Sequence, residues 1–158
     1  MEKYFITPIG TLSVSDSEAK IRIEKQYLAA ITGLEGFGNL QVLWWFDHCD
    51  TFTCRSHLTE QKPYVHGPEV LGTFATRSPM RPNPIALSCV EITYVDLEQG
   101  IIGISYIDAL DESPVLDIKP YTPSLDRVEK PEVPDWCRHW PDSVETSGDF
   151  DWINEFNF

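Results

Sequence analysis

Hydrophobic and polar positions along the first 120 residues follow the short repeats of β-strands more than those of helices. The alternation at 20–24 (KIRIE) predicts a half-buried strand, and the apolar run at 40–46 (LQVLWWF) predicts a strand buried on both faces. Further strands are predicted at 4–14, 70–75, 85–95, 101–107 and 115–118. The segments 85–95 and 101–107 flank the turn DLEQG and therefore predict a hairpin.

Helical patterns are short and few. Tyr27, Leu28 and Ile31 recur at helical spacing ahead of Gly33, which predicts a helix over 25–32. A doubly wound nucleotide-binding fold needs repeated strand–helix–strand units, for which this pattern has no room. The sequence therefore predicts a mainly all-β fold, a small closed or partly open β-barrel with one short helix and an irregular C-terminal extension.

The chain changes character near residue 125. Residues 1–125 carry the strand patterns and are predicted to form the barrel domain, with a long polar loop over 47–69. Residues 126–158 are acidic and hold three of the five tryptophans, so the segment is too aromatic to be a disordered tail. We expect this extension to pack on the barrel domain or on a partner subunit, with short helices at 135–140 and 149–156.

Composition limits the class of protein, and charge limits its partners. The length of 158 residues suits one domain, no apolar run approaches the roughly 18 residues of a membrane span, and MEKY does not begin like a secretion signal. We therefore expect a cytoplasmic protein without a membrane partner. The formal charge is −13, of which residues 1–95 carry −2 and residues 96–158 carry −11. This balance disfavours nucleic acid, although a small basic site can coexist with an acidic exterior.

Two motifs invite a functional interpretation that their context does not support. The glycine-rich segment 33–38 follows a helix and precedes a strand, the reverse of a phosphate-binding loop, so it is interpreted as a turn. His48, Cys49, Cys54 and His57 are zinc-ligand types, but one adjacent pair and the lack of a long spacer argue against a structural zinc site. The sequence gives no reason to predict a metal, and a disulfide is not expected in the cytosol.

Two polar segments are the strongest candidates for a ligand site. In 72–85 (GTFATRSPMRPNPI) closely spaced prolines stiffen a loop that carries Arg77, Arg81 and Asn83, groups that bind carboxylates, phosphates or ribose. Farther along, Asp117 and Lys119 are predicted to project from the same face of a short strand. They form either a simple ion pair or, beside the two arginines, part of a polar pocket.

Residues 72–88 (GTFATRSPMRPNPIALS) and 114–121 (PVLDIKPY) resemble, in order, the two signatures of the TsaA-like (TrmO) family. The resemblance extends over about residues 5–125. It implies a β-barrel methyltransferase that uses S-adenosylmethionine, forms a homodimer with the cofactor near the subunit interface, and methylates N6 of threonylcarbamoyladenosine in the anticodon loop of tRNA. Members usually carry a Pro/Gln-containing loop after the first strand, and this loop is absent here.

The resemblance also implies site residues. Arg77 would bind the cofactor's carboxylate, Leu87 its adenine, and Asp108 or Asp111 its ribose hydroxyls or amino group. The remaining implied cofactor positions are Asp47, His48, Ala109 and Leu110. Arg81 and Asn83 are expected to bind substrate. Asp117, Lys119 and Tyr121 are the candidate catalytic residues, because a modest base suffices for an acidified N6–H.

Two other functions stay open at this stage. The acidic composition and the missing loop favour a methyltransferase of small molecules on the same scaffold. The missing loop is also compatible with a non-catalytic module that binds S-adenosylmethionine.

Overall fold

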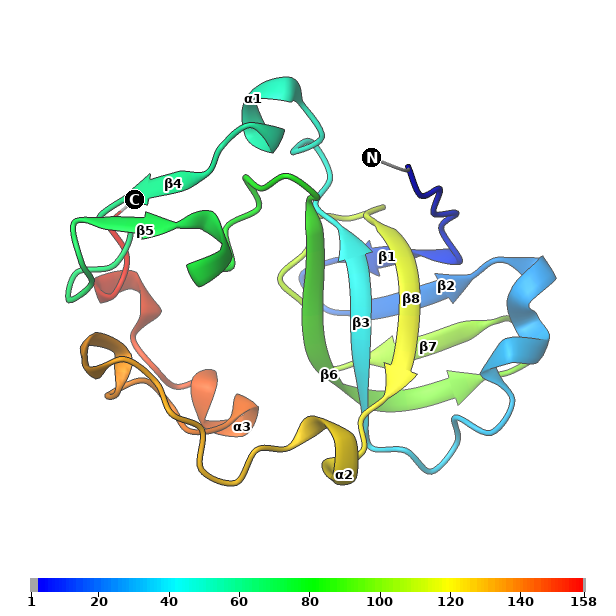
Figure 1. Cartoon of the computed structure of the whole chain (residues 1–158). Helices are drawn as coiled ribbons and strands as arrows, with labels where there is room; N and C mark the ends of the chain where they lie inside the picture. Colours follow the sequence, from blue (N-terminus) through cyan, green and yellow to red (C-terminus); the bar gives the residue numbers. More distant parts are fainter. Residues whose placement is uncertain (1–2, 158) are drawn as a thin grey trace.

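The computed structural model describes residues 3–157, and its main body is a closed antiparallel barrel (Figure 1). The outermost residues of the two predicted domains, 1–2 and 158, lie outside the described part. Around the barrel the order is β1-β2-β7-β6-β3-β8. The strands are β1 (Gly10–Val14), β2 (Ala19–Ile23), β3 (Asn39–Trp45), β6 (Ile85–Asp96), β7 (Ile101–Ile104) and β8 (Pro114–Pro120). The predicted all-β barrel is confirmed, and it is closed.

Strand periodicity fills the barrel with aliphatic side chains. Along β3, Leu40, Val42 and Trp44 are buried, while the residues between them face outward. Leu12 and Ile102, on opposite sides of β2, are fully buried. The predicted 85–95/101–107 hairpin forms as the β6–β7 pair, with Gly100 at a φ of 68° in its turn.

Close backbone packing at Gly10 allows the barrel to close. Gly10 pairs with Ile23 of β2 and with Val115 of β8, so it joins the two ends of the sheet. A Cβ atom at this position would lie 2.2 Å from the carbonyl oxygen of Arg22. Only glycine therefore allows β1 to approach its neighbour this closely.

Several elements differ from the sequence prediction. The predicted strand 4–14 is confined to β1, and the strand 101–107 ends at Ile104. The predicted helix 25–32 is the 3-10 helix η1 (Lys25–Ile31), and the glycine-rich segment after it is a turn with positive φ at Gly33 and Gly36. The barrel also has more than one short helix around it.

The largest correction concerns the segment between β3 and β6, which forms an arm beside the barrel. We define the arm as residues 50–76. It contains α1 (Phe52–Arg55), the paired strands β4 (Thr59–Gln61) and β5 (Val70–Gly72), and the 3-10 helix η2 (Thr73–Ala75). The predicted strand 70–75 ends before Thr73. The Thr73 hydroxyl donates to the His57 carbonyl, and the Thr73 carbonyl accepts a hydrogen bond from the Thr76 amide, which closes a helical turn.

The C-terminal extension (residues 126–157) begins at the last residue of α2 (Pro123–Asp126) and reaches the arm (Figure 1). Its first residue touches the barrel, where Asp126 accepts a 2.8 Å hydrogen bond from Gln41. Its last residues dock on the arm, since Val65 donates to the Glu155 carbonyl and Tyr64 forms a β-bridge with Phe156. The helices expected at 135–140 and 149–156 are only η3 (Asp135–Cys137) and η4 (Trp152–Asn154), with α3 (Val144–Ser147) between them.

Candidate functional site

The candidate site lies at the barrel end where β3 finishes and β6 and β8 begin, here called the site end. Trp45 pairs with Ile85, and Trp44 pairs with Val115. Because β3 is antiparallel to both β6 and β8, its last residues lie beside the first residues of these two strands. Three loops emerge there: the turn after β3, the proline-rich loop before β6 and the 105–113 loop before β8 (Figure 1). The two sequence motifs thus meet in space.

The turn after β3 presents Asp47 and His48 at the surface. His48 has a φ of 65°, a left-handed conformation that reverses the chain direction. Asp47 accepts a 3.0 Å hydrogen bond from the His48 amide, and its other oxygen lies 3.4 Å from His48 Nε2. The imidazole remains 81% exposed, so this pair is open to a ligand.

Arg77 and Arg81 differ in what they contact. The Arg81 guanidinium donates to the carbonyls of Thr73 and Thr76, at 3.2 and 3.1 Å, and therefore braces the η2 turn. Its Nε is buried without a hydrogen-bond partner. Arg77 is exposed, and no ion pair involves it within residues 3–157. Asn83, in the same loop, is also exposed. Arg77 is thus the arginine that is available to bind an anion.

Arg55 is a contact residue that sequence reasoning missed. It donates a 2.7 Å hydrogen bond to the Pro82 carbonyl, forms an ion pair with Asp50, and lies 5.5 Å from the centre of the Trp45 ring. These contacts tie α1 to the proline-rich loop and to the end of β3. No local pattern joins residues 55 and 82, so their contact emerges only in the fold.

The 108–111 segment is partly occupied by structural contacts. Asp111 accepts a 2.8 Å hydrogen bond from the Val14 amide, which fastens the segment to the end of β1. Ala109 packs against the barrel core, whereas Asp108 and Leu110 are exposed. Asp108 is therefore the more available of the two candidate ribose ligands.

The candidate catalytic residues are not all on one part of the surface. Leu87 and Asp117 pair with Leu43 from opposite sides, so their side chains share the outer face of the sheet, about 10 Å apart. Lys119 follows on that face and lies 2.5 Å from the Asp117 carboxylate. Tyr121 lies at the far end of β3, where its amide donates to the Asn39 carbonyl. The structure therefore groups Asp117 with Lys119 and separates Tyr121 from the site end.

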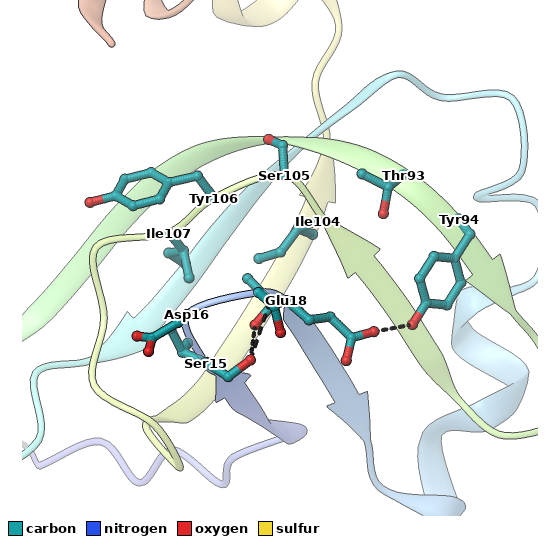
Figure 2. A pocket seen from close by; sticks show the side chains of 12 residues that line it. Ser15, Asp16, Glu18, Thr93, Tyr94, Ile104, Ser105, Tyr106 and Ile107 are labelled. Carbon is teal, nitrogen blue, oxygen red and sulfur yellow. Dashed lines mark hydrogen bonds between the residues drawn. The ribbon is translucent and has the colours of Figure 1, made fainter.

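A cavity of about 500 Å³ that the sequence did not predict lies beside the 105–113 loop (Figure 2). It is lined by the tight β1–β2 turn, by Tyr94 and by residues 104–107. Tyr94 donates to Glu18, which also pairs with Lys20 at 2.7 Å, and the Lys20 contact lowers the pKa of the Glu18 carboxyl. Its lining includes Ser105, Tyr106 and Ile107, the first residues of the loop that carries Asp108.

The free groups suit S-adenosylmethionine, which has a carboxylate, an ammonium, ribose hydroxyls and an adenine. Arg77 offers an exposed cation, Asp108 an exposed carboxylate, and Leu87 a side chain that is 44% exposed. The His48–His57 segment does not assemble a metal site among the described residues. His57 lies 3.0 Å from Glu60, and Cys49 is near Cys54, with burial raising the pKa of the Cys49 thiol.

Comparison with known proteins decides the family. The family description "tRNA-methyltransferase O N-terminal domain" matches residues 1–127. The chain belongs to the tRNA-methyltransferase O family. An S-adenosyl-L-methionine-binding protein of Archaeoglobus fulgidus is 38% identical over 118 residues, which cover 75% of this chain and 79% of that protein. The tRNA (adenine(37)-N6)-methyltransferase of Escherichia coli is 40% identical over 116 residues, or 72% of this chain and 48% of the enzyme.

The fold comparison agrees with this family. A crystal structure of TrmO superimposes with a TM-score of 0.66 and 26% sequence identity over 84% of this chain. The chain covers 64% of that TrmO chain and about half of the Escherichia coli enzyme, so it matches the family's N-terminal part. In residues 3–157, no helix has the length and apolar character needed to cross a membrane.

Proposed function

We propose that this protein is a cytoplasmic methyltransferase that transfers a methyl group from S-adenosylmethionine to tRNA, at N6 of threonylcarbamoyladenosine in the anticodon loop. The observation that carries the proposal is the family match over residues 1–127. The loops of the site end support it, because they carry an exposed arginine and exposed carboxylates, and the strand register brings the strands that follow these loops beside the end of β3. The names of the Escherichia coli and human relatives support the adenine N6 position.

Each available residue has a distinct role in cofactor binding. Arg77 pairs with the amino-acid carboxylate, and Asp108 accepts hydrogen bonds from the ribose hydroxyls or the ammonium. Leu87 and Leu110, both exposed, cover the adenine. Asp47 and His48 close the site from the turn after β3. Asp111 acts through the backbone, because its contact with Val14 fixes the segment that presents Asp108.

The bound cofactor supplies an electrophilic methyl group on its sulfonium sulfur. The protein must align the acceptor nitrogen with that methyl group and accept the proton released on transfer. Asp117 is the proposed proton acceptor, and Lys119, 2.5 Å away, orients its carboxylate. Arg81, which braces η2, and Asn83 shape the loop that faces the substrate. Tyr121 is the least suited of the proposed catalytic residues because it lies at the opposite end of β3.

A homodimer with the cofactor near its interface is part of this proposal. The arm exposes large apolar side chains that a second subunit would cover. Phe52 is 88% exposed, Phe74 81% and Leu58 62%. Analytical ultracentrifugation of the wild type and of Phe74→Asp tests this part, and a monomeric wild type that binds the cofactor contradicts it.

A labelled-methyl assay on total tRNA, beside a pool of small metabolites, tests the function. Wild-type protein should label tRNA, and labelling should fall steeply with salt, because phosphate contacts release counterions. Arg77→Ala should weaken cofactor binding, with Arg127→Ala, an exposed arginine of the extension, as the matched control. Asp117→Asn should lower turnover by roughly 100-fold or more while cofactor affinity is kept.

The acidic composition favours a second candidate function, methylation of a small molecule. The net charge of −13 repels a phosphate backbone, and the tight β1–β2 turn leaves the cavity of about 500 Å³ open to a compact acceptor. Labelling confined to the metabolite pool supports this candidate. Cofactor binding in calorimetry without any labelling supports a non-catalytic module.

A further inference from the structure

Three ligand-type side chains meet where the extension docks on the arm. His66 lies in the turn between β4 and β5, His139 follows η3, and Glu155 follows η4. One nitrogen of each histidine and one carboxylate oxygen lie within 4.8 Å of one another. His139 and Glu155 belong to the extension, whereas His66 belongs to the arm. The three side chains therefore come together only where the extension docks on the arm. None of these residues belongs to the candidate cofactor site.

We propose that His66, His139 and Glu155 bind a divalent transition-metal ion of the zinc class, which fastens the C-terminal extension to the arm. Two imidazoles and one carboxylate form a donor set that zinc uses in proteins, with water or another group completing the coordination. Hard cations such as Mg²⁺ and Ca²⁺ prefer all-oxygen sets, so two nitrogen donors select against them.

The geometry requires only small movements. Zinc–ligand distances of about 2.0–2.2 Å in a tetrahedron put ligand atoms about 3.4 Å apart. His139 Nε2 and Glu155 Oε1 are 2.8 Å apart, so they separate slightly around the ion. His66 is exposed in a turn, and its ring meets the His139 ring edge-on with centroids 5.3 Å apart. A change of its side-chain rotamer brings it into the coordination sphere.

The surroundings of Glu155 orient it for this role. The residue is only 8% exposed, and its second oxygen accepts a 3.0 Å hydrogen bond from Trp140 Nε1. That contact leaves the first oxygen directed at His139. Carboxylates that bind metals are commonly held in place by such a hydrogen bond to the second oxygen. Phe150, with its ring 6.2 Å from that of His139, adds an apolar wall on one side.

Zinc titration of the full chain, monitored by competition with a chromophoric chelator, tests the site. A background of Cys49→Ser with Cys54→Ser removes the thiol pair that would otherwise compete for zinc. In this background we expect one zinc per chain. His66→Ala and Glu155→Gln should lose about 100-fold in affinity, and Trp140→Phe about tenfold.

His48→Ala is the matched control for zinc affinity, because this exposed histidine lies outside the group. His66→Ala keeps the test valid if the buried Glu155 variant fails to fold, because the His66 side chain is exposed and lies in a turn, where its removal leaves no buried cavity. Unchanged affinity in His66→Ala, a loss in His48→Ala, or no zinc binding by the starting protein overturns the proposal.

Protease protection tests the fastening role. Zinc should slow tryptic cleavage at Arg138 in the wild type, and a chelator should reverse the protection. The same zinc concentration should not protect His66→Ala. Stoichiometric zinc binding without protection would refute the fastening role. Because none of these measurements uses methyl transfer, their failure is separate from a failure of the proposed function.

Discussion

The barrel and the cluster formed by the arm and the extension achieve packing in different ways. The barrel buries aliphatic side chains such as Leu12, Ile21 and Ile102 inside a closed ladder of backbone hydrogen bonds. The cluster packs aromatic rings around short turns with little regular structure. Its rings belong to Tyr64, Trp136, Trp140, Phe150, Trp152 and Phe156. Large aromatic rings supply most of the contact area in this cluster, so it packs with few helices and strands.

This difference predicts different responses to damage. A closed sheet shares its hydrogen bonds among all strands, so loss of one core contact weakens the whole barrel. The extension contacts the barrel at Asp126 and the arm from Trp136 onward, while residues 127–134, between these two contacts, are exposed. The extension is therefore expected to open locally before the barrel unfolds.

The largest effect is expected in the barrel core. Ile102→Ala removes a fully buried side chain from β7 and should lower the free energy of unfolding by about 3 kcal/mol. The matched control is Ile153→Ala in the extension, where the side chain is 87% exposed and the expected change is within about 0.5 kcal/mol. Urea denaturation measures both. Equal losses would mean that the two regions do not differ as described.

The strand prediction succeeded where one face of each strand is buried. Leu40, Val42 and Trp44 fall inside because the side-chain period of a strand is two, and this regularity is visible in the sequence. The arm had no such signal. Thr73 ends β5 through hydrogen bonds to His57 and Thr76, which depend on a side-chain hydroxyl rather than on hydrophobic pattern.

The site was predictable only in outline. The two motifs located the loops of the site end, and strand register then brought them together. What each charged group does was not predictable, because Arg77 and Arg81 stand in the same motif and only the fold commits Arg81 to backbone carbonyls. The meeting of Val65 with Glu155, ninety residues apart, likewise has no local signature.

Barrel closure offers the second test. Gly10→Ala places a methyl group against the Arg22 carbonyl, so β1 must shift away from β2, at a cost of about 2 kcal/mol. Gly38→Ala is the matched control, since nothing lies within 4 Å of its Cβ position. Thermal unfolding should show a lower midpoint only for Gly10→Ala. A similar midpoint in both variants would indicate that β1 tolerates the shift and that closure is not tight.

A smaller, local effect is expected in the aromatic cluster. Trp152→Leu removes ring contacts with Phe150 and Phe156 and the hydrogen bond from Trp152 Nε1 to the Ser147 carbonyl. The docking of the extension should weaken by about 1.5 kcal/mol. Tryptic cleavage at Arg138 should accelerate, while the main urea transition of the barrel stays in place. A shift of that transition as large as the one in Ile102→Ala would show that the extension and the barrel unfold as one unit.

The smallest effect concerns Cys49, at the junction between the barrel and the arm. Burial, and next the neighbouring Cys54, raise its thiol pKa above the ordinary value of 9.0, so the fold favours the neutral thiol. Any stability that this preference contributes is complete below pH 9 and is lost as pH rises through the raised pKa. Alkylation of Cys49, followed by peptide mass spectrometry, should have its pH midpoint above that of the urea-unfolded chain. Coincident midpoints would show that the Cys49 thiol is as solvated as in an unfolded chain. The junction between the barrel and the arm would then be packed loosely, unlike the barrel core.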